Sequence, residues 1–161
     1  MPDRVTPFLM FTGDAERAME LYTSLFDDAR ILTLTRWGAE GQGVEGTVQE
    51  AAFSIAGQVF RCFDSPPVHA FTFTPSFSVF VDVASAEELD RLFAGLSAGG
   101  GVLMPLGDYG FSRRFGWVND RFGVSWQLNL PEPAGERTRP PSPGGDEGLG
   151  AEPGTTASAS T

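Results

Sequence analysis

The residue types that most often do chemistry are scarce in this chain. His69 is the only histidine and Cys62 the only cysteine among the 161 residues. One histidine excludes any site that needs two imidazoles from one chain, and any Ser-His-Asp arrangement that does not use His69. His69 lies in a proline-flanked segment, which favours a surface loop over a ligand or proton shuttle. Cys62 lies in an apolar strand with no base nearby, which is typical of a buried, inert thiol.

Charged residues on the predicted strands offer only weak signs of chemistry. Glu50, near the middle of a strand, has no second titratable partner in register, so a solvated residue is favoured over an acid/base group. Arg113 and Arg114 alternate on one strand, so only one of them can face inward. An inward arginine would favour a carboxylate or phosphate ligand. A surface pair is the favoured alternative.

Polar residues on the last strand indicate a binding surface instead. Gln127 alternates with Trp126 and Leu128, so Gln127 faces away from a helix on which the other two pack. The same parity places three residues of the fifth strand on the side of Gln127: Ser76, Ser78 and Phe80. Phe77 is then expected in the core. Such a surface suits a small neutral or planar ligand, while polar groups satisfied within a filled interior remain the alternative.

Aromatic residues at the strand ends admit two interpretations. Trp37, Phe115 and Trp117 have flat rings that stack on a planar ligand. The favoured interpretation is that they pack in the core or at a dimer contact.

Two copies of one pattern of elements position these residues. The first copy has a strand, a helix and three strands, at 4–11, 14–26, 29–37, 47–55 and 59–63. The second repeats that order at 76–83, from Ser85, 102–106, 113–118 and 124–130. Ser85 and Glu88 form a capping-box pattern at the start of the second helix. Three strands after each helix imply antiparallel neighbours, so the pattern predicts an α+β fold and not a doubly wound parallel sheet.

Composition divides the chain into a domain and a tail. All 14 Phe and all 3 Trp lie within residues 1–130, which we expect to form the folded domain. Residues 131–161 are rich in Gly, Pro and acidic groups and contain little that could be buried, so they are predicted to be disordered.

The net charge of the chain limits the kinds of molecule that it is expected to bind. The chain has 21 Asp and Glu against 11 basic residues, all arginine, for a net charge of -10. This balance argues against nonspecific nucleic-acid binding, which depends on neutralising phosphates. No apolar run approaches the ~20 residues of a membrane span, and the first residues lack the pattern of a secretory signal. We therefore expect a cytoplasmic protein with no membrane or nucleic-acid partner.

The chain resembles the vicinal oxygen chelate superfamily, which includes glyoxalase and the bleomycin-resistance proteins, and within it the PhnB-like branch. Four segments carry the resemblance: AERAMELYTSLF (15–26), FSIAGQVFRCFD (53–64), EELDRLFAGLSAGG (87–100) and FGWVNDRFGVSWQL (115–128). The resemblance implies two βαβββ modules, about 4–64 and 74–130, whose curved mixed or antiparallel sheets enclose a cavity. It also implies a homodimer in which modules from two chains meet.

The resemblance also locates where metal-using members hold their ion. Those positions fall near Pro7, Arg61, Ser76 and Gln127. Proline has no side-chain donor, arginine is a cation and serine is a poor ligand for divalent ions. We therefore expect no metal and no cofactor. The branch is also commonly labelled demethylubiquinone methyltransferase-like, but the Gly-rich turn and alternating βα units of a usual methyltransferase are not evident.

Three hypotheses for function follow. The favoured one is metal-free binding of a small molecule, with six candidate binding residues: Pro7, Arg61, Ser76, Arg114, Trp117 and Gln127. The second is an isomerase or lyase of the vicinal oxygen chelate type, using Glu50, Arg61 or Gln127. The third is a dimerising scaffold whose cavity is filled.

Overall fold

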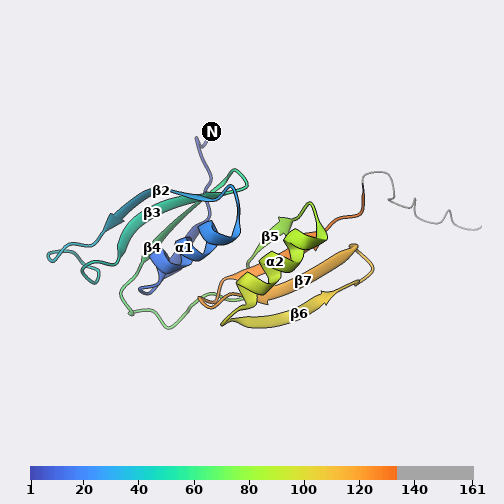
Figure 1. Cartoon of the computed structure of the whole chain (residues 1–161). Helices are drawn as coiled ribbons and strands as arrows, with labels where there is room; N and C mark the ends of the chain where they lie inside the picture. Colours follow the sequence, from blue (N-terminus) through green and yellow to red (C-terminus); the bar gives the residue numbers. More distant parts are fainter. Residues whose placement is uncertain (134–161) are drawn as a thin grey trace, which may run out of the picture.

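The computed structural model describes residues 1–133. Most of the predicted tail, 131–161, therefore lies outside the described residues. Figure 1 shows two modules side by side, each with a helix packed on one face of its sheet. No helix within residues 1–133 is long and apolar enough to cross a membrane.

Each module has the predicted βαβββ order. The first contains β1 (Phe8–Phe11), α1 (Ala15–Leu25), β2 (Arg30–Arg36), β3 (Val48–Ile55) and β4 (Gln58–Asp64). The second contains β5 (Ser78–Asp82), α2 (Ala86–Ser97), β6 (Gly101–Gly107), β7 (Arg114–Asn119) and β8 (Ser125–Leu130). The sheet orders are β1-β4-β3-β2 and β5-β8-β7-β6. Each sheet is mixed, because β1 pairs with β4 and β5 with β8 in parallel while the other pairs are antiparallel. The predicted α+β class is confirmed.

Helix α1 is capped from a distant strand. The side chain of Asp14, the residue before the helix, bonds to Arg17 and makes no cap. Instead, Asp64 Oδ1 at the end of β4 accepts hydrogen bonds from the backbone N–H groups of Gly13 (2.8 Å) and Ala15 (3.0 Å). A buried carboxylate therefore satisfies donors that a helix start leaves unpaired.

Helix α2 begins and ends as its local sequence predicts. Ser85 Oγ accepts from the N–H of Glu88 (3.1 Å), and the Glu88 carboxylate accepts from the N–H of Ala84 (3.0 Å). Gly99, just past the helix, has a φ of +75°, which glycine adopts without strain. The apolar side of the helix is fully buried at Leu89, Leu92 and Leu96.

The two modules share one hydrophobic core. Trp126 of β8 packs against two residues of the first module, with ring centroids 4.9 Å from Tyr22 and 5.6 Å from Phe26. The Tyr22 hydroxyl donates to Asp120 Oδ2 at 2.7 Å, so a hydrogen bond also joins α1 to the β7–β8 turn. Gly95 of α2 lies so close to Leu25 of α1 that a Cβ at residue 95 would be 2.4 Å from it.

The strands differ locally from the sequence prediction. β1 begins at Phe8 rather than residue 4, because the ladder to β4 starts with the Pro7 carbonyl accepting from the Arg61 N–H at 2.9 Å. β5 begins at Ser78 rather than residue 76, after a turn. The expectation that Phe77 is in the core is wrong, since this turn residue is 56% exposed. The pairing of β2 with β3 shifts register between Glu50 and Val48, and as a result the Val48 side chain points into the core.

Candidate functional site

The face of the second sheet away from α2 carries a polar stripe flanked by aromatic rings. Ser125, Gln127 and Asn129 follow one another on this face of β8. Strand pairing places Phe80 of β5 and Trp117 of β7 on either side of Gln127. The prediction that Phe80 shares the side of Gln127 is confirmed. Phe80 is 54% exposed, so this face is open to solvent.

Ser125 lies on the same face of β8 as Gln127 and takes part in a short chain of hydrogen bonds. The Trp117 indole N–H donates to Ser125 Oγ at 2.7 Å, and Ser125 Oγ lies 2.6 Å from Ser78 Oγ. Ser125 is buried. A hydroxyl can accept two hydrogen bonds and donate one. Either hydroxyl of the Ser78–Ser125 pair can be the donor, and Ser78 Oγ also donates to the Pro75 carbonyl at 3.4 Å.

The open face of the first sheet carries a charged pair beside aromatic rings. Arg61 of β4 forms an ion pair with Glu50 of β3. The Arg61 guanidinium also lies over the Phe8 ring, 5.5 Å from its centroid, and Phe8 stacks on Phe63 at 5.2 Å. Glu50 thus has an ionic partner that the sequence did not reveal, because antiparallel pairing brings these two strands together.

A groove connects these two open faces. It lies between the residues leading into β1, the segment 72–77 that joins the modules, and the start of β8, with a volume of about 450 Å³. Six of its lining residues matter for recognition: Pro7, Phe8, Thr72, Phe73, Phe77 and Ser125. The walls are mainly apolar, with hydroxyl groups as the polar side chains. This size and lining are typical of a small-molecule site.

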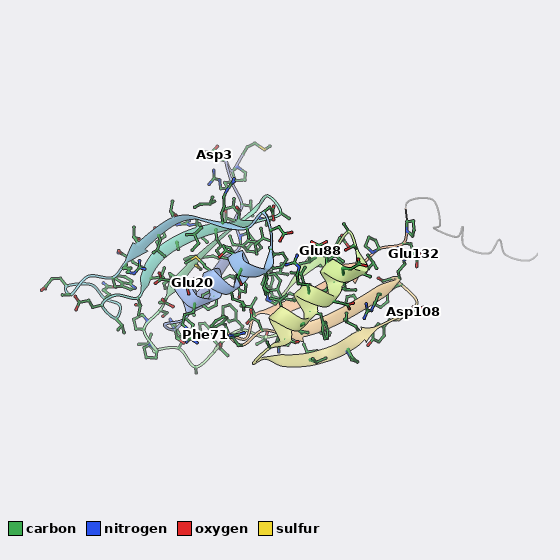
Figure 2. The ribbon with its side chains drawn as sticks, viewed as in Figure 1. Asp3, Glu20, Phe71, Glu88, Asp108 and Glu132 are labelled. Atoms are coloured by element: carbon green, nitrogen blue, oxygen red, sulfur yellow. The ribbon has the colours of Figure 1, made fainter. Side chains whose placement is uncertain are left out.

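The joining segment also has a strongly exposed part. Phe71, labelled in Figure 2, is 66% exposed and stacks on His69 with ring centroids 4.9 Å apart. His69 is exposed and lies outside helices and strands, which confirms its predicted place in a surface loop. The next aromatic residue, Phe73, turns inward and packs on Phe11 at 5.0 Å.

A second cavity, of about 500 Å³, lies at the other end of the module boundary. Four acidic residues line it; Asp27 forms an ion pair with Arg91 at 3.6 Å, and the other three accept hydrogen bonds within the protein. Asp28 accepts from the Ala56 N–H, and Asp82 accepts from the Asn129 amide. Glu88 caps α2. These carboxylates hold turns and strands in place, so the groove at Ser125 is the stronger candidate site.

The structure places five of the six sequence-predicted residues in or beside the groove. Pro7 lines it, and Arg61 covers Phe8, which also lines it. Trp117 bonds to Ser125, and Gln127 follows Ser125 on the same face.

The fifth is Ser76, and the sixth, Arg114, lies elsewhere. Ser76 is exposed and precedes β5; its hydroxyl lies 2.5 Å from that of Thr74, which lines the groove. Arg114 pairs with Asp90 of α2 at 2.7 Å, on the helix-covered side of its sheet. It therefore does not join the other candidates.

Pro7 is the one sequence-predicted candidate that lines the groove, and the sequence does not point to its other residues, Ser125 and Phe73 among them. Ser125 is a neighbour of Gln127 on the last strand, and Phe73 follows the segment that contains His69. The alternation Phe71-Thr72-Phe73-Thr74 is the one local signal that this segment is more than a linker. Phe73 of this segment points inward because it packs against Phe11 of β1, a contact that depends on the tertiary structure.

The positions that the resemblance assigns to a metal site do not fit a divalent ion. Pro7 and Ser76 precede β1 and β5, and the strand residues paired with Arg61 and Gln127 are Phe8 and Phe80. Neither phenylalanine has a donor atom, and Arg61 is a cation. Among the described residues, no three His, Cys, Asp or Glu side chains are grouped so that they could hold an ion.

Two buried groups near the core have shifted acidities and lie outside the groove. Burial, with a smaller effect of Asp64, raises the pKa of Cys62 from 9.0 to about 12, so the thiol stays protonated at neutral pH. Burial, the charge of Asp120 and the hydrogen bond to it raise the pKa of Tyr22 well above its usual 10.0. Both groups are fully buried in the core.

Comparison with known proteins decides the family. A family model described as 3-demethylubiquinone-9 3-methyltransferase matches residues 3–129. The chain belongs to this family. The chain is 52% identical to the PhnB protein from Bacillus cereus, which carries the same methyltransferase name, and the two structures superpose with a TM-score of 0.77. That similarity covers 80% of this chain and 99% of the other.

More distant relatives agree with the family assignment. Protein YjdN of Escherichia coli strain K12 is 24% identical over 140 residues, covering 78% of this chain and 94% of YjdN. Protein PA1353 from Pseudomonas aeruginosa is 26% identical with a TM-score of 0.71, covering 81% of this chain and 98% of PA1353. The fosfomycin resistance protein FosX of Listeria monocytogenes shares the fold at 15% identity and a TM-score of 0.58, covering 82% and 95% of the two chains. The PhnB-like chain is therefore a member of the vicinal oxygen chelate superfamily.

Proposed function

We propose that this PhnB-like protein binds a small planar organic molecule, without a metal, in the groove between Phe8 and Ser125. One observation carries the proposal: a buried hydroxyl, with an indole N–H bonded to it, lies on a mainly apolar groove wall. Small-molecule sites typically combine apolar walls with a few fixed polar groups that orient the ligand. Ser125 supplies such a group, and Phe8 and Phe77 supply flat surfaces.

Methyl transfer, which the family description names, has no support in the described residues. Their two mixed sheets do not form the alternating βα units of the usual methyltransferase fold. A second candidate function is an isomerase or lyase. It is favoured by one observation, the Glu50 carboxylate held by Arg61 beside the groove wall. In such an enzyme Glu50 would remove a proton and Arg61 would stabilise the resulting anion.

We also expect the protein to form a homodimer. Large aromatic side chains are exposed on or beside the open faces, with Phe8 58%, Phe80 54% and Phe111 64% accessible. A second copy placed over these faces would bury them and close the space above the groove. Light scattering during size-exclusion chromatography should give twice the 17.2 kDa mass of the chain. A single-chain mass at working concentration would contradict the dimer.

The groove is tested by thermal unfolding in the presence of planar probes, such as a naphthoquinone and an aromatic carboxamide. A ligand at ten times its Kd stabilises the folded state by about 1.4 kcal/mol, which corresponds to a rise in Tm of roughly 3 to 6 °C. We expect Ser125→Ala to reduce that rise for a probe that the wild type binds.

The matched control is Ser54→Ala, because Ser54 is also a buried strand serine but lies on the first sheet and does not line the groove. A probe whose effect is the same in both variants would place its binding elsewhere. Failure of every planar probe to raise the wild-type Tm would contradict the proposed function.

A further inference from the structure

We infer that the Arg61–Glu50 ion pair makes the groove selective for an uncharged ligand with a hydrogen-bonding edge, such as an aromatic carboxamide, lactam or imide. The inference rests on the proposed function, because it concerns the charge of the molecule that the groove takes.

The ion pair is tied to the groove wall by three contacts. Arg61 and Phe8 are direct partners on neighbouring strands, and the guanidinium lies over the Phe8 ring at 5.5 Å. The Arg61 backbone N–H bonds to the carbonyl of Pro7 at 2.9 Å. Pro7 and Phe8 both line the groove. The charged end of Arg61 is therefore held over one of the groove's aromatic walls.

The pair is accessible but carries no net charge. The side chains of Arg61 and Glu50 are 50% and 54% exposed. Neither lines the groove itself, but Arg61 covers Phe8, which does, and Arg61 holds Glu50 beside it. A guanidinium has five N–H donors, so the ion pair leaves donors free, and Glu50 leaves acceptor positions free. The edge thus offers a donor and an acceptor side by side.

An anionic ligand is disfavoured by this arrangement. A carboxylate approaching Arg61 would come close to the negative charge of Glu50 and would have to compete with it. The net charge of -10 for the whole chain adds to the repulsion. An uncharged amide has neither cost, since its N–H matches the carboxylate and its C=O matches the guanidinium.

The test compares two probes that share a ring and differ in charge, naphthalene-1-carboxamide and naphthalene-1-carboxylate. Their Kd values are measured by isothermal titration calorimetry at low salt for the wild type and for Glu50→Gln. We expect the wild type to prefer the carboxamide, and Glu50→Gln to shift the ratio of the two Kd values toward the carboxylate by about tenfold, the scale of one nearby charge in a half-exposed site.

Glu16→Gln is the matched control. Glu16 of α1 forms an ion pair with Arg36 of β2, and this pair is about as exposed as the Arg61–Glu50 pair. Arg36 belongs to the same sheet as Arg61, but the Glu16–Arg36 pair lies on the side of that sheet that α1 covers. This variant removes the same charge from the chain without touching the groove and should leave the ratio unchanged. Arg61→Gln provides a second variant, which should weaken the carboxylate about tenfold more than the carboxamide.

The outcomes separate the two claims. In one outcome both probes bind while Glu50→Gln leaves the ratio of their Kd values as in the wild type, and in another the wild type prefers the carboxylate. Either result overturns the inference about charge and leaves the proposed binding groove intact. If neither probe binds the wild type, the proposed function fails and the inference fails with it. A shift as large in Glu16→Gln as in Glu50→Gln would show an effect of net charge alone and would also overturn the inference.

Discussion

The hydrogen bond between Tyr22 and Asp120 joins the two modules, and Tyr22→Phe removes it alone. The Tyr22 hydroxyl is the donor at 2.7 Å, while its ring packs on Trp126 at 4.9 Å and on Phe53 at 5.8 Å. Phenylalanine keeps the ring and these contacts. Asp120 keeps three donors, which are the Trp126 indole N–H and two backbone N–H groups of its own turn.

The magnitude follows from the charge and burial of the acceptor. Asp120 is 3% exposed, and a hydrogen bond to a charged group contributes about 1.5–3 kcal/mol. We expect Tyr22→Phe to lower the free energy of unfolding by that amount, with a fall in Tm of roughly 3 to 12 °C.

The effect should also depend on pH, with a definite sign. The pKa of Tyr22 is raised in the folded protein, so above pH 10 the unfolded chain loses a proton that the folded chain keeps. The contribution of Tyr22 is complete below pH 10 and declines above it, by at most about 1.4 kcal/mol per pH unit. Tyr22→Phe lacks this decline, so its deficit relative to the wild type should shrink in alkali.

Urea unfolding followed by tryptophan fluorescence, near pH 7 and near pH 11, measures both effects. Tyr109→Phe is the matched control, because the Tyr109 hydroxyl donates to the Pro105 carbonyl at 2.7 Å but is 39% exposed. The reasoning is refuted if Tyr22→Phe and Tyr109→Phe differ by less than about 0.5 kcal/mol. A deficit that does not change with pH would refute the raised pKa.

Two further predictions concern buried groups outside the groove. The raised pKa of Cys62, about 12, predicts that iodoacetamide modifies the folded protein at least about a thousandfold more slowly than a free thiol near pH 8, as measured by mass spectrometry. Rapid alkylation of the folded protein would contradict this. Asp64→Ala removes the acceptor of the Gly13 and Ala15 N–H groups and should cost about 2–4 kcal/mol in urea unfolding. Asp14→Ala, at a residue without a side-chain cap, should cost under about 0.5 kcal/mol; equal costs would refute the assignment of the cap to Asp64.

Local sequence determined most of the elements. The doubled strand-helix-strand-strand-strand order is confirmed, because each element depends on periodicity and capping within a few residues. The α2 start at Ser85 and Glu88 is an example, since both partners lie within one helical turn. The alternation within β8 is another, because strand parity alone places Gln127 opposite in side to Trp126 and Leu128.

The candidate site was decided by tertiary structure. Arg61 meets Glu50 across two antiparallel strands, and Asp64 reaches the start of α1 from the end of β4. The segment around Phe73 folds inward only because β1 lies beside it. Tyr22 and Asp120 are 98 residues apart in sequence yet share a hydrogen bond. Periodicity and spacing describe neighbours along the chain, whereas the charges, hydroxyls and rings of the groove become neighbours only when the two modules pack.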